Sequence, residues 1–201
     1  MPKKKFVARV VFIHGVRWSK KDNRMLRLAV AFKEAGFCVV VPRYGFVPAL
    51  LMGVFSWLDN RIADTMGSFI LEDDILVGHS NGATLAYLIS KRKKLRGAIL
   101  VNAALETTEL PTADFVHVYY NRGDCVAQWS AIIPFHPWGA MGGLGYEGPH
   151  CPSVSNIDQS NPPEPHLPPL CGHSDIFSPG KLRPWGRYMA SRLLQALRNN
   201  K

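Results

Sequence analysis

The stretch Gly78-His79-Ser80-Asn81-Gly82 has the residue types and spacing most suited to chemistry. It follows the apolar run Ile75-Leu76-Val77 and precedes a helical pattern that begins near Ala83. A serine between two glycines at a strand-to-helix turn is called a nucleophile elbow, because the tight turn holds the hydroxyl above the end of the sheet. Side chains at the flanking positions would clash with the neighbouring chain. We therefore predict that Ser80 is a nucleophile.

A serine hydroxyl is a poor nucleophile by itself, so it needs a base within hydrogen-bond reach and an acid that orients the base. Asp124 is the candidate acid, because the predicted strand Phe115–Tyr120 and a turn containing Gly123 precede it. Groups at the carboxyl ends of parallel strands face a common crevice. Two alternatives stay open: Asp124 bonds only its own turn backbone, or Asp158 is the acid.

Three of the seven histidines are predicted to have roles other than catalysis. His14 precedes a glycine and is expected to shape the loop after the first strand. His79 is adjacent to Ser80 in sequence and is expected to point away from the turn. His117 lies inside a predicted strand.

The remaining histidines, His136, His150, His166 and His173, all lie in the long irregular part of the chain. His173 comes directly before the last predicted helix and completes the order serine, aspartate, histidine, which is the order recorded for this class of sheet. We predict that His173 is the base, with His150 and His166 as the main alternatives.

Hydrolysis through a serine also requires donors that stabilise the oxyanion. The backbone N–H of Asn81 directly follows the nucleophile and is the first candidate. The second should come from the loop after the first strand, His14-Gly15-Val16-Arg17, where the backbone N–H of Val16 is the candidate.

The elements that would carry these residues alternate between strands and helices. The predicted strands are Arg9–Ile13, Phe37–Val41, Ile75–Val77, Gly97–Asn102 and Phe115–Tyr120, and the predicted helices run from Asp22 or Asn23 to Ala35, from Asn81 to Lys91 and from Leu182 to Leu197. This alternation predicts a parallel sheet with right-handed crossovers, covered by helices on both faces.

Two further segments have less regular patterns. Residues 46–57 are apolar and loosely helical, which favours a core-facing helix over the wall of a lipid-like pocket. Residues 133–169 are rich in proline and glycine, with one possible short strand at Val154–Ile157. Loops of this length often act as lids or binding loops.

Length and composition predict one globular domain over residues 1–201, with 47% hydrophobic and 19% charged residues. No apolar run approaches the length of a membrane span. The basic residues Lys3–Lys5 precede a short apolar segment that we interpret as a strand, so we expect a cytoplasmic protein. The four cysteines lack metal-like spacing, so no metal is expected. A Cys151–Cys171 disulfide is the less favoured alternative to free thiols.

The net charge of +9 raises the possibility of a polyanionic partner. The basic residues cluster only at Lys3–Lys5 and Lys91–Lys94, and neither cluster is interleaved with aromatic residues as in a nucleic-acid groove. The second cluster falls at a predicted helix C-terminus, where cations are favourable. We therefore expect no nucleic-acid partner.

Four of these landmarks together resemble an α/β-hydrolase: His14-Gly15, the Ser80 elbow, Gly123-Asp124-Cys125-Val126 and Gly172-His173-Ser174. The resemblance covers the chain from about Val10 to its end. It implies a single-domain α/β-hydrolase fold with a mostly parallel central sheet, helices on both faces and no large cap domain. It also implies a Ser80–His173–Asp124 triad that cleaves a small-molecule ester through an acyl-enzyme, without cofactor or metal.

The chain departs from the family pattern in ways that make it similar to the small minimal lipases and esterases. The first two strands of the family sheet are missing, and a single glycine follows His14 where large-acyl lipases have a glycine run. The alternative is a catalytically silent scaffold of this fold that binds a small ligand or a protein. The sequence does not predict the oligomeric state.

Overall fold

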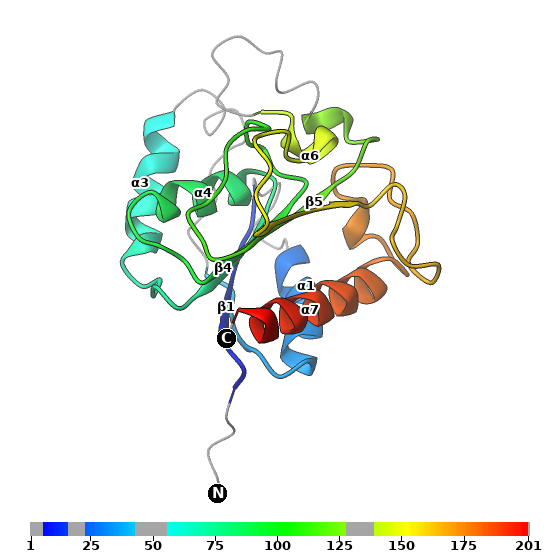
Figure 1. Cartoon of the computed structure of the whole chain (residues 1–201), viewed down its shortest axis with the longest axis horizontal. Coiled ribbons are helices and arrows are strands. Elements are labelled where there is room, and N and C mark those ends of the chain that lie inside the picture. Colours follow the sequence, from blue (N-terminus) through cyan, green and yellow to red (C-terminus); the bar gives the residue numbers. More distant parts are fainter. Residues whose placement is uncertain (1–5, 16–22, 43–55, 128–138, 201) are drawn as a thin grey trace, which may run out of the picture.

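The computed structural model describes residues 6–15, 23–42, 56–127 and 139–200 of the chain. Its centre is one six-stranded sheet in which every pair of neighbouring strands is parallel (Figure 1). The order across the sheet is β2-β1-β3-β4-β5-β6. The strands are β1 (Arg9–Ile13), β2 (Cys38–Val40), β3 (Ile75–His79), β4 (Gly97–Val101), β5 (Val116–Tyr120) and β6 (Val154–Asp158).

The strand order reverses direction between β1 and β3. The chain passes from β1 to one neighbour, β2, and then crosses back so that β3 lies on the other side of β1. Ile13 at the end of β1 pairs with Gly78 near the end of β3. In open parallel sheets the crevice at such a reversal, outside the carboxyl ends of the strands, is where ligands bind.

Helices cover both faces of the sheet. Helices α1 (Arg24–Glu34) and α7 (Leu182–Asn199) pack together on one face, and α3 (Ser56–Gly67) and α4 (Asn81–Ser90) pack together on the other (Figure 1). In the chain, the short helix α6 (Met141–Leu144) lies between β5 and β6, and the 3-10 helix η1 (Asp175–Phe177) lies between β6 and α7.

Strand side chains divide between the apolar clusters on the two faces of the sheet, because successive residues of a strand point to opposite faces. Val10 and Phe12 join the core under α1 and α7, whereas Val11 and Ile13 join the core under α3 and α4. Phe12 also meets Phe32 of α1 edge to face at 5.0 Å between ring centroids. Burial on both faces explains why the strands are continuous apolar runs.

The five predicted strands and the short strand near Val154 are confirmed, with differences at their ends. β3 extends two residues further than predicted, through Gly78 to His79, which pairs with Val101 of β4. β6 forms the edge of the sheet beside β5. The three predicted helices are also present as α1, α4 and α7.

Two helices lie where the sequence predicted no defined element. Helix α3 occupies residues 56–67, whereas the predicted apolar helix at residues 46–57 lies almost wholly outside the described residues. Helix α6 lies in the segment rich in proline and glycine, whose first residues, 133–138, are also outside the description. Among the described residues, no helix combines the length and the apolar character that crossing a membrane requires.

The basic cluster Lys91–Lys94 directly follows α4, and each of its side chains has a partner within the protein. These partners are the Tyr87 ring, the Asp64 carboxylate, the Gly67 carbonyl and the Asp114 carboxylate, in sequence order of the cluster. The Lys93 ammonium thus caps the carbonyl end of α3, where a cation is favourable. The cluster begins at the C-cap residue of α4, the helix C-terminus predicted for it from the sequence.

Candidate active site

Ser80 occupies the turn between β3 and α4 with a strained backbone. Its φ is 56° and its ψ is −128°, a conformation that residues with a side chain rarely adopt. The turn is held from both sides, because the Ser80 N–H donates to the Val101 carbonyl at 3.0 Å and the Ala83 N–H donates to the Ser80 carbonyl at 3.0 Å. The backbone at Ser80 is therefore fixed between β4 and the first turn of α4.

Three glycines permit the close packing around this turn. A Cβ on Gly78 would lie 2.5 Å from the Gly82 carbonyl oxygen, and a Cβ on Gly82 would collide with the Ile13 carbonyl oxygen. A Cβ on Gly15 would lie 2.8 Å from the Ser80 Cβ. The ends of β1 and β3 thus pack so closely that these positions have no space for a side chain.

The structure brings Ser80, His173 and Asp124 into one hydrogen-bonded row. The Ser80 hydroxyl lies 2.8 Å from His173 Nε2, and His173 Nδ1 lies 2.7 Å from Asp124 Oδ2. A carboxylate can only accept, so Nδ1–H donates to Asp124 and Nε2 is left to accept the serine proton. The His173 side chain is 14% exposed and Asp124 is fully buried. The serine and the base face solvent, and the acid does not.

Each carboxylate oxygen of Asp124 accepts hydrogen bonds from its own set of donors. Oδ2 also accepts from Asn102 Nδ2 at 3.0 Å, and Oδ1 accepts from the Ala127 N–H at 3.0 Å at the start of a helical turn. Burial favours the neutral carboxyl, but hydrogen bonds from His173, Ala127 and Asn102 outweigh it and lower the pKa of Asp124. Asp124 thus accepts from its own turn backbone and also contacts His173, so the alternative in which it bonds only its own turn does not describe this arrangement.

His79 supports His173, contrary to the expectation that it points elsewhere. Its Nε2–H donates to the His173 carbonyl at 3.0 Å, and the two rings lie 5.1 Å apart between centroids. The Phe177 ring packs edge to face on His79 at 4.9 Å. Burial, followed by the neighbouring His173, lowers the pKa of His79 to about 3. A neutral ring with a fixed donor therefore holds the backbone of the candidate base.

The segment that carries His173 is also tied down on both sides of the histidine. Asn121 Nδ2 donates to the Gly172 carbonyl at 3.2 Å. Asp175 accepts from the Cys171 N–H at 3.0 Å and from Lys181 Nζ at 2.7 Å. Burial alone would raise the pKa of Asp175, but these bonds lower it to about 2. Asp175 therefore holds the loop that carries His173.

The structure describes one of the two candidate oxyanion donors, Asn81. Asn81 is the first residue of α4, where backbone N–H groups lack helical partners and favour an anion. Its side chain is buried and donates to Asp59 Oδ1 of α3 at 3.0 Å. Val16 lies outside the described residues, so its role remains a prediction. His14 shapes the same loop by donating from Nδ1 to the Gly15 carbonyl at 2.8 Å.

The hydrogen-bonded row includes none of the alternative acids and bases that the structure describes. His150 and His166 are exposed, and His166 Nε2 lies 3.3 Å from the Glu164 carboxylate. Asp158 Oδ2 lies 3.0 Å from Arg122 Nε, and its other oxygen accepts from the Ser160 N–H. His136 lies outside the described residues.

Sequence reasoning missed two polar residues near the row, His79 and Asn102. Asn102 follows β4 with a φ of 46°, and asparagine tolerates this left-handed conformation better than most residues. An asparagine directly after a buried strand was the available signal. The signal for His79 was its place beside Ser80, but nothing local indicates its contact with a residue 94 positions away.

The described residues offer no evident metal site or disulfide. Among them, no three histidine, cysteine, aspartate or glutamate side chains are grouped as metal ligands. All four cysteines have free thiols. Cys151 Sγ lies 3.0 Å from Ser153 Oγ, whereas Cys171 is exposed and contacts Asp175, so the alternative Cys151–Cys171 bridge is not formed.

No family model and no curated protein matches the sequence. Solved structures do match. A monoacylglycerol lipase from Paleococcus ferrophilus superposes with a TM-score of 0.60 at 14% identity, with 94% of each chain covered. Mouse alpha/beta hydrolase domain-containing protein 10 gives 0.61 at 10% identity, covering 94% of this chain and 90% of that one.

A third similar structure is Est1E from Butyrivibrio proteoclasticus, which was solved with ferulic acid bound. It has a TM-score of 0.57 and 12% identity, and the match covers 98% of this chain and 93% of that one. Identities this low show the fold alone. The shared sheet, crossovers and chain coverage do establish the architecture, and the chain therefore has the α/β-hydrolase fold.

Proposed function

We propose that this protein is a serine hydrolase that cleaves carboxylic esters with Ser80, His173 and Asp124 as its catalytic triad. One observation carries the proposal: His173 lies within hydrogen-bond distance of Ser80 through Nε2 and of Asp124 through Nδ1. This is the arrangement that a base requires in order to take a serine proton while an acid fixes its tautomer. The strained backbone at Ser80 is a second support.

In the first half of the reaction, Ser80 Oγ attacks the ester carbonyl carbon as its proton passes to His173 Nε2. The buried Asp124 carboxylate then faces an imidazolium, which its negative charge stabilises. The Asn81 N–H donates to the developing oxyanion, with the Val16 N–H as the proposed second donor. When the carbon–oxygen bond breaks, His173 returns the proton to the leaving alcohol and the acyl group remains on Ser80.

In the second half, a water molecule replaces the alcohol. His173 Nε2 takes a proton from the water as its oxygen attacks the acyl carbon, and the same two N–H donors bind the oxyanion. The bond to Ser80 Oγ breaks, His173 returns the proton to the serine, and the carboxylic acid leaves. No metal or cofactor is assigned a step in this proposal.

The main alternative, a silent scaffold that binds a ligand or a protein, is less well supported. Such a scaffold has no need of a base beside the serine, and it would be favoured by a His173 distant from Ser80. The observed separation is 2.8 Å. A fully buried carboxylate with a lowered pKa behind the base also has no evident purpose in a scaffold.

The substrate class is proposed from the neighbours and from the chain together. Similar structures include a monoacylglycerol lipase and Est1E with ferulic acid bound, and we therefore choose acyl and aromatic esters as the first to test. The apolar sequence of residues 46–58 also favours an ester with an apolar acyl or aromatic group.

The proposal is tested by hydrolysis of p-nitrophenyl esters of increasing acyl length, together with a ferulate ester and a monoacylglycerol. We expect turnover of at least one ester, and a loss of about 10⁴-fold or more in kcat for Ser80→Ala. Ser174→Ala is the matched control, because this neighbouring serine bonds Arg24 and not the row. Equal rates for wild type and Ser80→Ala would contradict the proposal.

A further inference from the structure

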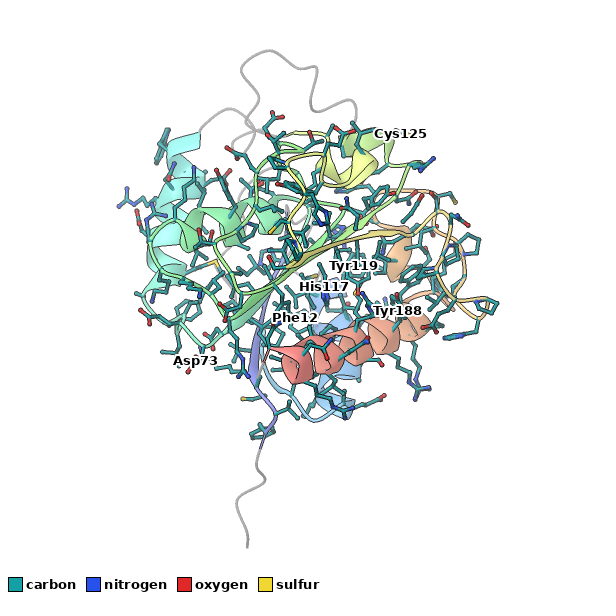
Figure 2. All side chains as sticks on the ribbon, viewed as in Figure 1. Phe12, Asp73, His117, Tyr119, Cys125 and Tyr188 are labelled. Atoms are coloured by element: carbon teal, nitrogen blue, oxygen red, sulfur yellow. The ribbon has the colours of Figure 1, made fainter. Side chains whose placement is uncertain are left out.

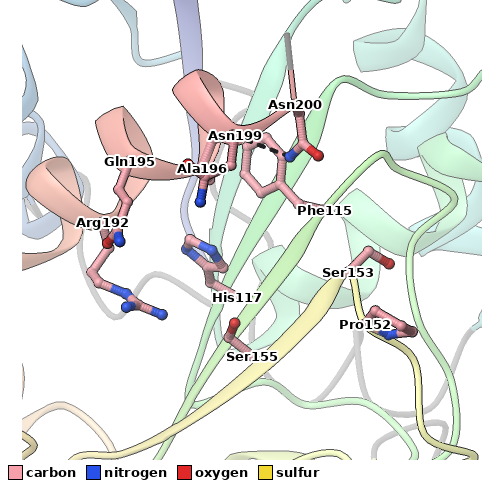
Figure 3. A pocket seen from close by; sticks show the side chains of 10 residues that line it. All are labelled: Phe115, His117, Pro152, Ser153, Ser155, Arg192, Gln195, Ala196, Asn199 and Asn200. Carbon is pink, nitrogen blue, oxygen red and sulfur yellow. Dashed lines mark hydrogen bonds between the residues drawn. The ribbon is translucent and has the colours of Figure 1, made fainter.

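A polar pocket lies on the opposite side of the sheet from α4, between α7 and the strands β5 and β6. It has a volume of about 270 Å³ and is lined by Phe115, His117, Pro152, Ser153, Ser155, Arg192, Gln195, Ala196, Asn199 and Asn200 (Figure 3). His117 and Ser155 are the second residues of their strands, near the amino ends. Asp124 lies beyond the carboxyl end of β5. The pocket is therefore separate from the Ser80 site.

The pocket lies near the amino ends of β5 and β6, whereas Ser80 follows the carboxyl end of β3. In Figure 2, Asp73, just before β3, and Cys125, just after β5, mark opposite sides of the molecule. His117 and Tyr119 lie between the sheet and α7 in the same view. Both face the α7 side, because residues two apart on a strand share a face.

His117 is a buried polar side chain without a partner. It is only 5% exposed, and its Nδ1 is buried with no hydrogen bond from the described residues. Its ring contacts Phe115 at 5.4 Å between centroids. Burial, followed by the charge of Arg192, lowers the pKa of His117 to about 4. An unpaired buried imidazole is costly unless something else binds it.

Arg192 brings an unpaired positive charge to the same space. Its Nε is buried and has no hydrogen-bond partner among the described residues. Among the described residues, no carboxylate lines the pocket, whereas the neighbouring Arg183 and Arg187 of α7 both approach Glu34. In Figure 3 the guanidinium of Arg192 lies on the same side of the pocket as His117 and Ser155. Only Arg192 among these three arginines faces a pocket with uncompensated charge.

The remaining lining groups favour an acceptor-rich ligand. Ser155 supplies a hydroxyl donor, whereas the Ser153 hydroxyl already lies 3.0 Å from Cys151 Sγ. The Asn200 amide caps the Ala196 carbonyl at 3.1 Å, so it reduces the number of free acceptors at the end of α7. The partial negative charge of a helix C-terminus disfavours an anion only within its last turn, and Arg192 lies further back. The volume is far larger than the roughly 30 Å³ of one water molecule.

We propose that this pocket binds a phosphate group, either free or as the monoester of a small alcohol, through Arg192, His117 and Ser155. The planar guanidinium matches two phosphate oxygens, and the imidazole and hydroxyl donors reach the others. Binding also supplies a negative charge beside the Arg192 guanidinium. The chain's net charge of +9 adds a long-range attraction for the anion.

The test is a titration of the full chain with inorganic phosphate and, separately, with glycerol 3-phosphate at constant ionic strength, followed by ¹H–¹⁵N NMR. We expect saturable shifts at the backbone amides of Ser153, Ser155 and His117. Tighter binding of glycerol 3-phosphate would assign the site to phosphomonoesters, and equal or tighter binding of inorganic phosphate would assign it to the free anion. No saturable shift with either ligand would overturn the proposal.

Two variants show whether the pocket residues cause the binding. Arg192→Met keeps most of the side-chain stem and should weaken phosphate binding by about tenfold or more. Arg198→Met removes the same charge from an exposed position of α7 and should change binding less than twofold. Equal losses in the two variants would mean attraction by net charge alone and would overturn the site. Ser155→Ala gives a second, less disruptive change that should also weaken binding.

Discussion

Ser80 and His173 meet at 2.8 Å, but the two are held by different means. Backbone packing holds Ser80: its turn is closed by glycines at positions 15, 78 and 82 and by hydrogen bonds to the sheet. Side-chain hydrogen bonds hold His173, because the chain between β6 and α7 contains only one 3-10 turn. The position of Ser80 thus requires glycines, which have no side chain, around its turn. The position of His173 requires polar side chains that bond its ring and its backbone.

Substitutions should therefore have different effects in the two halves of the site. On the serine side, an added methyl group displaces backbone, so substitutions should affect folding before catalysis. On the histidine side, a lost donor leaves the core intact and changes only the aim of the ring. Activity and stability should therefore separate in one half of the site and fall together in the other.

The largest effect is expected from Asp124→Asn. The asparagine amide carries no negative charge to stabilise the His173 imidazolium, and it favours the wrong tautomer of His173. We therefore expect kcat to fall by about 10⁴-fold. Asp158→Asn is the matched control, since Asp158 bonds Arg122 and Ser160 and lies outside the row. Ester hydrolysis measured at pH 7 checks both. A similar loss in the two variants would mean that Asp124 has no special role.

The next effect concerns the serine side and is a loss of stability. Gly82→Ala places a methyl group against the Ile13 carbonyl, which belongs to β1 and cannot move aside without disturbing the sheet. We expect a loss of about 3 kcal/mol or more in the free energy of unfolding. In contrast, a Cβ on Gly67 meets nothing within 4 Å. Gly67→Ala should therefore be neutral, or stabilise by up to about 1 kcal/mol.

Denaturant unfolding monitored by circular dichroism distinguishes these glycine variants. If Gly82→Ala unfolds at the wild-type midpoint, the turn is less tightly packed than its contacts indicate. A loss of activity with no loss of stability would also contradict the expected coupling on the serine side.

Asp59 should make stability depend on pH in an unusual direction. Burial raises its folded pKa to about 6, although its bond to Asn81 acts in the opposite direction. The unfolded chain loses this proton near the ordinary value of 3.8, so the native state holds more protons between these values. The Asp59 contribution is thus favourable below pH 4 and is lost as pH rises through about 6.

Asp59→Asn removes this dependence while it keeps an oxygen that can accept from Asn81. Relative to wild type, the variant should be equally stable near pH 4 and more stable by roughly 2 kcal/mol at pH 7. Asp64→Asn, at an exposed position of the same helix, should change stability by less than about 1 kcal/mol. Urea unfolding across this pH range is the measurement. A pH-independent difference for Asp59→Asn would contradict the raised pKa.

The smallest effect is expected at His79, where stability and activity should separate. His79→Phe keeps a ring against Phe177 but removes the donor to the His173 carbonyl. We expect kcat to fall about tenfold, with little change in KM or in the melting temperature. His166→Phe, at an exposed site on the same segment, should leave kcat unchanged. Equal melting temperatures and equal kcat values for wild type and His79→Phe would show that this bond does not position the base.

The two halves of the site also differ in how far the sequence predicts them. Gly78, Ser80 and Gly82 form a local pattern whose physical cause, close packing at a turn, acts within five residues. The apolar runs of the strands are equally local, and so the sheet was predictable. The Val16 donor remains a prediction, since its loop lies outside the described residues.

What the sequence did not predict depends on contacts between distant parts of the chain. His79 bonds a residue 94 positions away, and Asn102 reaches Asp124 across 22. Helix α3 was missed because Asp59 and Asn60, which favour turns and caps, interrupt its start. Its apolar residues Ile62, Ala63 and Met66 become meaningful only when packed against α4 and the sheet. No local pattern carries such information.

The most direct test of the central claim is labelling by an active-site-directed fluorophosphonate, read by intact mass and peptide mapping. The account predicts one adduct per chain, carried by Ser80, absent in Ser80→Ala and formed far more slowly in His173→Ala. Ser174→Ala should be labelled at the wild-type rate. An unlabelled wild-type protein, or equal labelling of wild type and Ser80→Ala, would contradict the account.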